Sequence, residues 1–193
     1  MPTDLERIRA LDARAVRLSA GLVRQTTVAD LRRETPCAGW DLADLLAHMT
    51  AQHRGFAAAA RGHGGDLALW AAAPAADPVG AHEAAAGDVL AAFAEVREEE
   101  RPFVLPEFSA VRDFAAARAI GFHFLDYVVH AWDVAAALGV PFTPEADLLD
   151  AALPLALAVP PGSAAFAPEL PAPPGGDTLS RILTRLGRQA APD

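Results

Sequence analysis

The stretch from Gly121 to Ala135, GFHFLDYVVHAWDVA, has the apolar spacing of a helix and constrains the fold more than any other segment. At about 100° per residue, His123, Asp126 and His130 fall within an arc of about 60° on that helix. A carboxylate and an imidazole four residues apart can point at one metal ion. The same pair also arises as an intrahelical hydrogen bond or on a solvated face, so spacing alone leaves both interpretations open.

A second segment, Thr35 to Met49, supplies another candidate ligand. A Pro/Gly turn leads into Asp41 and an amphipathic run in which His48 borders the apolar stripe. A helix that turns His48 toward a bundle core would bring it against Asp126 and His130, completing a two-histidine, one-carboxylate set with open coordination positions. The alternative is a partly buried core histidine whose ring nitrogens find backbone partners.

Helical spacing recurs along the chain, and we find no sustained alternation of apolar and polar residues that would predict strands. Asp77 and Pro78 have the pattern of an N-cap followed by a first-turn proline, and Gly139 that of a C-terminal cap. The predicted fold is all-α, a four-helix bundle with additional short C-terminal helices. The predicted helices are Thr3–Arg24, Asp41–Arg61, Pro78–Glu100, Val111–Leu138, Pro144–Val159 and Leu179–Leu186.

Length and composition predict one domain over residues 1–193, including a Pro-rich strap at about 160–176 and the short terminal helix. The net charge of −9 argues against a nucleic-acid partner, which would require clustered cations. All 16 basic residues are Arg. The absence of Lys excludes a Schiff base, a pyridoxal phosphate anchor and a Walker A motif.

The single cysteine, Cys37, excludes an intrachain disulfide framework and predicts a cytoplasmic protein. Its place near the start of the His48 helix is compatible with a thiol-exchange role, or with a small side chain that packs the turn. The charged N-terminus predicts no signal peptide, and no window is apolar enough to predict a membrane span.

Three other polar residues are candidates for pocket or supporting groups. His123 shares the stripe of the proposed ligands, Gln52 is one turn beyond His48, and Asp133 is placed to accept the ring N–H of His130 and fix its tautomer. Asp133 could equally cap the helix or pair with an arginine. His53, about 140° around its helix from His48, is expected to face elsewhere.

The remaining residues of interest are expected to be structural. His63 and His82 are predicted to be surface residues, and Arg112 and Arg118 are predicted to form helix-surface ion pairs instead of binding an anionic substrate group. Trp40 and Trp132 are expected to anchor the core, since large aromatic side chains mostly bury area.

Taken together, the two segments resemble the DinB-like metal-binding family related to the mycothiol-dependent maleylpyruvate isomerase N-terminal domain. The resemblance extends from the N-terminal helix to a closing Leu-Gly-Arg at 186–188. Its motifs are carried by Thr35, Pro36, Cys37, Gly39, Trp40, Asp41 and His48, and then by Asp126, His130, Trp132 and Asp133.

The resemblance implies a four-helix bundle with a divalent metal, usually taken to be zinc although nickel or another ion is an alternative, on His48, Asp126 and His130. It also implies mycothiol as a cofactor or co-substrate in some members. The acidic ligand position holds Asp126 where the isomerase has a Glu, so ligation here requires a tight bundle. The chain leaves no room for a substantial second domain after the bundle, and maleylpyruvate isomerisation itself is therefore not inferred.

The leading hypothesis is a metal-dependent transferase or isomerase that uses a low-molecular-weight thiol such as mycothiol on an electrophilic substrate, as a monomer or homodimer. The competing hypothesis is a non-catalytic metal-binding or stress-associated helical protein. A third is a helical interaction domain without metal.

Overall fold

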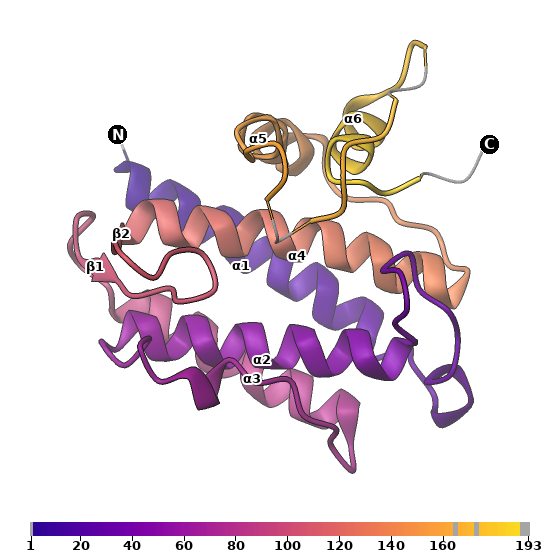
Figure 1. Ribbon diagram of the computed structural model, residues 1–193, viewed down its shortest axis with the longest axis horizontal. Coiled ribbons are helices and arrows are strands. Elements are labelled where there is room, and N and C mark those ends of the chain that lie inside the picture. Colours follow the sequence, from indigo (N-terminus) through magenta and orange to yellow (C-terminus); the bar gives the residue numbers. More distant parts are fainter. Residues whose placement is uncertain (1, 164–165, 172–173, 190–193) are drawn as a thin grey trace.

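Four long helices form the main body of the molecule. The computed structural model describes residues 2–163, 166–171 and 174–189 (Figure 1). Helix α1 packs against α3 and α4, and α2 packs against α3 and α4, which makes a four-helix bundle as predicted. The helices are α1 (Asp4–Val23), α2 (Leu42–Ala60), α3 (Pro78–Glu95) and α4 (Ala116–Leu138).

The helix ends follow local chemistry that the sequence makes visible. Thr3 and Asp41 each accept a hydrogen bond from the backbone N–H three residues on, within capping boxes at the starts of α1 and α2. Asp77 caps α3 ahead of Pro78, and Gly139 ends α4 in the left-handed conformation, as predicted. These boundaries set the positions of the side chains along α2 and α4.

Two shorter helices cover the outer side of α4. Helices α5 (Ala146–Leu157) and α6 (Thr178–Arg185) pack on each other, and α5 also packs on α4. Figure 1 shows them in orange and yellow above the bundle. Within the predicted strap at 160–176, the residues that the structure describes form no helix or strand.

The expectation of no strands is wrong in one place. Strands β1 (Pro102–Phe103) and β2 (Phe114–Ala115) pair antiparallel, with Phe103 opposite Phe114. Two-residue strands are too short to show an alternating pattern. Because β2 takes residues 114–115, α4 begins at Ala116 and not at Val111.

Helix α3 also ends earlier than predicted. It stops at Glu95, where Arg9 of α1 donates hydrogen bonds to the carbonyls of Phe93 and Val96 at 3.4 and 2.8 Å. Arg9 provides donors for carbonyls at the end of α3, and it is too far away in the sequence for this helix end to be predicted from local sequence.

Two 3-10 helices lie in connections between the predicted helices, η1 (Val28–Asp30) and η2 (Leu67–Leu69). After η2, Trp70 is buried against α2, and its ring N–H donates to the carbonyl of Gly64 at 2.8 Å. A Cβ at Gly55 would lie 2.3 Å from atoms of the Trp70 ring, so α2 needs a glycine there.

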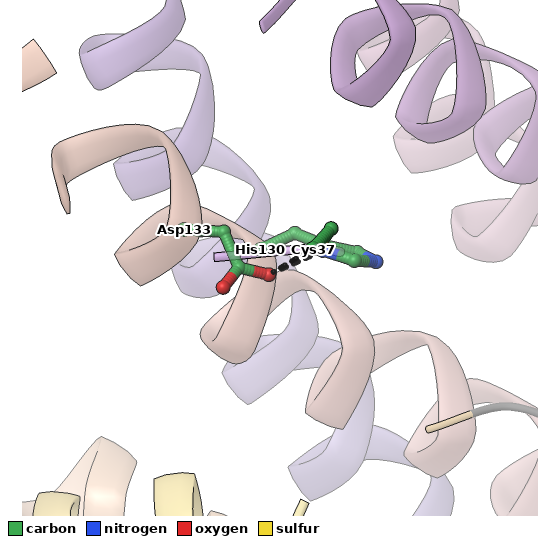
Figure 2. A group of neighbouring side chains, drawn as sticks. All are labelled: Cys37, His130 and Asp133. Carbon is green, nitrogen blue, oxygen red and sulfur yellow. Dashed lines mark hydrogen bonds and ion pairs between the residues drawn. The ribbon is translucent and has the colours of Figure 1, made fainter. Parts of the chain in front are cut away.

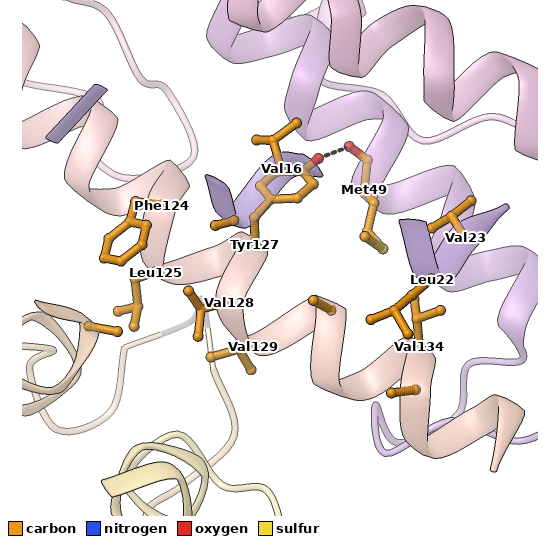
Figure 3. Close-up of a cluster of buried hydrophobic side chains, with 14 of the residues drawn as sticks. Val16, Leu22, Val23, Met49, Phe124, Leu125, Tyr127, Val128, Val129 and Val134 are labelled. Atoms are coloured by element: carbon orange, nitrogen blue, oxygen red, sulfur yellow. Dashed lines mark hydrogen bonds between the residues drawn. The ribbon is translucent and has the colours of Figure 1, made fainter. Parts of the chain in front are cut away.

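The core extends along the bundle as two clusters of buried apolar side chains. In the cluster of Figure 3, Tyr127 lies among valines and leucines and its hydroxyl donates to the carbonyl of Met49. That bond ties α4 to α2 next to two of the proposed ligands, His48 and Asp126. In the part of the chain that the structure describes, no helix is long and apolar enough to cross a membrane.

Candidate metal centre

The loop before α2 determines where that helix begins. Thr35 Oγ1 accepts a hydrogen bond from the amide of Cys37 at 3.2 Å and donates to the carbonyl of Trp40 at 2.9 Å, and Gly39 has the positive φ that the turn requires. Arg33 donates to two carbonyls at the C-terminal end of α4. The loop is therefore held against the helix that carries the other candidate ligands.

His48 lies about two turns into α2 and faces α4. Its ring centroid is 5.2 Å from that of His130, and His130 Nε2 is 3.3 Å from Asp126 Oδ1. One ligand atom from each of the three residues lies within 4.8 Å of the others. Two histidines and one carboxylate from α2 and α4 thus converge on one point.

The distance between Asp126 and His130 would suit two ligands of one divalent ion. Zinc ligands at about 2.1 Å in tetrahedral arrangement lie about 3.4 Å apart, close to the 3.3 Å between Asp126 and His130. A charged N–H···O hydrogen bond would be shorter, at about 2.7–2.9 Å. Asp126 reaches this distance from His130 without the additional methylene of a glutamate.

The protonation states of His48 and Asp126 suit a metal, whereas His130 would have to lose a proton to bind one. Burial, followed by the charge of His130, lowers the pKa of His48 to about 4, so its ring is neutral at pH 7. Burial alone would raise the pKa of Asp126, but the charges of His130 and His48 lower it to about 2. Burial would lower the pKa of His130, yet Asp126 and Asp133 outweigh it and raise that pKa well above its usual value.

Asp133 holds the far side of the His130 ring. Its buried Oδ2 lies 2.9 Å from His130 Nδ1, 3.1 Å from an Arg188 guanidinium nitrogen and 3.3 Å from Cys37 Sγ. Figure 2 shows Asp133, His130 and Cys37 side by side. With Nδ1–H donated to Asp133, Nε2 faces Asp126 and His48, and it would offer a lone pair to a metal once its proton is lost.

Arg188 is a residue of this site that sequence reasoning did not assign. It lies three residues beyond the end of α6 and is buried, and it donates to Asp133 and lies 3.4 Å from Cys37 Sγ. The only signal in the sequence was its place in the closing Leu-Gly-Arg, which carries no chemistry by itself.

Cys37, His130 and Asp133 form a second group that could in principle hold a metal. The Arg188 guanidinium already contacts both Asp133 and Cys37, so a cation occupies that side. A metal ion there would have to displace a buried guanidinium and leave it without its partner. The His48, Asp126 and His130 set has no such competitor among the described residues.

A cavity of about 790 Å³ opens beside Asp126. Its walls come from α1, α4, α5, the loop at 107–114 and residues 158–163 and 166. Gln52, one turn beyond His48, donates at 2.7 Å to Glu107, which lines this cavity. The volume of the cavity is in the range of small-molecule sites. Because Asp126 lines the cavity and also belongs to the group of His48, Asp126 and His130, the cavity is next to that group.

His123 lies elsewhere, in a buried polar group between the helices. Its Nδ1 is 2.6 Å from Asp12 of α1, and its Nε2 is 3.1 Å from Nδ1 of His53, whose ring stacks on Tyr127. His123 is fully buried and does not line the cavity. As expected, His53 faces away from the His48 set.

Two expectations about surface and core are wrong. His82 is fully buried, with its ring centroid 5.0 Å from that of His53, whereas His63 is exposed as predicted. Trp40 is 37% exposed, although its ring lies 4.9 Å from that of His48. The burial of His82 and the exposure of Trp40 depend on which neighbouring segments cover each side chain. The packing of the bundle sets those neighbours.

Comparisons with known proteins agree with this architecture. The sequence profile of the mycothiol maleylpyruvate isomerase N-terminal domain family matches residues 13–135. That range contains His48, Asp126, His130 and Asp133, and it ends well before Arg188.

Similar proteins include two relatives in Mycobacterium tuberculosis, the uncharacterized protein MT0763 of strain CDC 1551 and the uncharacterized protein Rv0738 of strain H37Rv. Each is 31% identical over 184 residues, with 88% of this chain and 92% of the relative covered. A crystal structure of the mycothiol-dependent maleylpyruvate isomerase has the same fold, with a TM-score of 0.60 at 17% identity over 82% of this chain and 71% of that one. The chain belongs to the mycothiol maleylpyruvate isomerase N-terminal domain family.

Proposed function

We propose that this protein is a metal-dependent enzyme that activates a low-molecular-weight thiol, mycothiol, for reaction with an electrophilic substrate. The observation that carries the proposal is the convergence of donor atoms from His48, Asp126 and His130 beside a cavity of about 790 Å³. Family membership supports mycothiol as the thiol. The single cysteine supports a reducing cytoplasm as the compartment.

The residues of the site have distinct parts in this chemistry. His48 would hold the ion through its neutral ring, His130 would do so after losing the proton that its raised pKa favours, and Asp126 would supply a negative charge. A divalent ion so held lowers the pKa of a bound thiol, so that a thiolate is available at neutral pH. Zinc fits the donor set best, and nickel is the principal alternative.

Asp133 and Arg188 would keep the site in one geometry. Asp133 accepts the Nδ1–H of His130 and so fixes its tautomer and ring orientation, and Arg188 neutralises the buried charge of Asp133. The cavity would admit the thiol and its electrophile from the side of Asp126. Thiol addition, transfer or isomerisation through a thiol adduct are all compatible with this arrangement.

The second candidate is a non-catalytic metal-binding protein that uses the same three ligands. The cavity favours the enzyme, because a site that only stores or senses an ion has no need for a chamber of this size beside one ligand.

The proposal is tested with protein purified without an affinity tag and reconstituted with zinc or nickel. We expect one equivalent of bound metal and mycothiol-dependent conjugation of an electrophile such as 1-chloro-2,4-dinitrobenzene. His130→Ala should lose both, and His63→Ala, which changes an exposed histidine, should keep both. Stoichiometric metal without turnover of any electrophile would favour the second candidate, and failure to bind metal at all would refute both.

A further inference from the structure

The cavity beside Asp126 is apolar at its centre and cationic at one end. Apolar side chains of α1, α4 and α5 form much of its wall, and Arg7, Arg112 and Arg118 line it as well. The meaning of this pattern for the substrate rests on the proposed function, because Asp126 marks the end of the cavity at which the reaction would occur.

Three residues of α4 line the cavity one after another along its length. Arg118, Phe122 and Asp126 are spaced four residues apart, so they lie on one stripe of the helix, and all three line the cavity. Eight residues of helix place the backbone of Arg118 about 12 Å from that of Asp126. A molecule whose reacting group lies at Asp126 would therefore cross Phe122 before it reached Arg118.

The middle of the cavity is lined by aromatic rings. Phe108 of the loop and Phe122 stack at 5.1 Å between centroids with an interplanar angle of 5°, and Phe114 meets Phe122 edge-on at 5.2 Å. Phe108 is still 38% exposed. An exposed, ordered aromatic ring in a concave wall is suited to an apolar or flat ligand body.

The arginines at the other end have no ion-pair partner among the residues that the structure describes. The guanidinium of Arg112 lies 5.1 Å from the centroid of Phe114, and that of Arg118 lies 5.8 and 5.6 Å from those of Phe114 and Phe122. In the described part of the chain, neither Arg112, Arg118 nor Arg7 forms a salt bridge, which corrects the expectation of helix-surface ion pairs for the first two. Their stacking on rings fixes the guanidinium planes while the N–H donors stay free for an anion.

The acidic residues of the cavity do not cancel this charge. Glu107 keeps its charge while it accepts a hydrogen bond from Gln52, and a bound ion would neutralise the charge of Asp126. Asp4 and Glu107 then stand against three arginines, which leaves the cavity lining one net positive charge. In a chain with a net charge of −9, an unpaired cationic group at the end of an apolar cavity indicates an anionic ligand.

From this arrangement we propose that the substrate is an amphipathic electrophile: a reactive carbon at the Asp126 end, an aromatic or aliphatic body over Phe122, and a carboxylate or similar anion bound by Arg112 and Arg118. A small, uniformly polar acid would leave the aromatic middle of the cavity unfilled. A neutral apolar electrophile would leave the arginines without a partner.

Binding of unreactive probes separates this proposal from catalysis. Octanoate and 1-octanol share an apolar chain and differ in the charged end, and each is titrated into zinc-loaded and into chelator-treated protein by calorimetry. We expect octanoate to bind more tightly than 1-octanol in both preparations. Arg118→Gln or Arg112→Gln should each weaken octanoate about fivefold and leave 1-octanol unchanged.

Arg54→Gln is the matched control, because Arg54 is also exposed but lines a different cavity. It should change neither affinity. Equal binding of the two probes, or octanoate binding that ignores both arginine variants, would overturn the proposal. So would octanoate binding that disappears with the metal, since the carboxylate would then be a metal ligand. Because the readout needs no turnover, failure of the thiol chemistry would leave a positive result here intact.

Discussion

Replacement of His82 by leucine is expected to stabilise the protein, although it removes a fully buried polar residue. His82 lies on α3, and neither of its ring nitrogens has a hydrogen-bond partner in the structure. A buried polar group without a partner costs about 1–3 kcal/mol relative to its solvated state. Leucine is similar in volume and favours helices, so His82→Leu should raise the free energy of unfolding at pH 7 by about 1–3 kcal/mol.

The same residue should account for part of the acid sensitivity of the fold. Burial lowers the pKa of His82 from 6.5 to about 4, so the folded state disfavours the proton that the unfolded chain accepts. A depressed folded-state pKa means that this stability is complete above about pH 6.5 and is lost as the pH falls toward 4. With these two pKa values, the linkage relation gives a loss of about 2 kcal/mol by pH 5 and about 3 kcal/mol by pH 4.

Urea denaturation of the wild type, His82→Leu and His63→Gln at pH 7 and pH 5 measures both effects. The difference in unfolding free energy between the two pH values should be smaller by about 2 kcal/mol in His82→Leu than in the wild type. The exposed His63 should behave as a neutral control. If His82→Leu is less stable than the wild type at pH 7 and keeps its full pH dependence, the buried ring is satisfied by a partner and the reasoning is wrong.

Three further predictions concern the metal site and the packing of α2. Asp133→Asn should weaken metal binding by about 10–100-fold, because the amide no longer fixes the His130 tautomer. Competition with a chromophoric chelator measures the affinity, and an unchanged affinity would show that Asp133 does not support the site. The pKa of His130 is raised well above 6.5 in the metal-free protein, so metal binding at pH 7 should release about one proton. Calorimetry in buffers of different ionisation enthalpy measures this release, and its absence would contradict the His130–Asp126 geometry. Gly55→Ala should destabilise the protein by about 1–3 kcal/mol in thermal or chemical unfolding despite the better helix propensity of alanine, because the new Cβ would meet the Trp70 ring. A stabilised Gly55→Ala would show that Trp70 moves freely.

Local sequence predicted each of the helices α1 to α6, although not every helix end. The caps at Thr3, Asp41, Asp77 and Gly139 act on neighbouring backbone groups, so their effect can be predicted from residues three or four positions apart. The spacing of Asp126, His130 and Asp133 within one helix likewise fixes their relative direction. The early end of α3 and the two-residue strands were missed because they depend on Arg9 and on contacts between the segments around residues 102 and 115.

The helices, and the stripe of α4 that carries the carboxylate and one imidazole, can be predicted from the chain because helical geometry is periodic and local. Packing between helices is what turns His48 toward that stripe, buries His123 and His82 elsewhere, and brings Arg188 from beyond α6 to Asp133. Packing also leaves Arg112 and Arg118 beside an apolar cavity without an ion-pair partner among the described residues. The rotation of each helix about its own axis is set by which apolar faces pack together, and no spacing within a single segment encodes that choice.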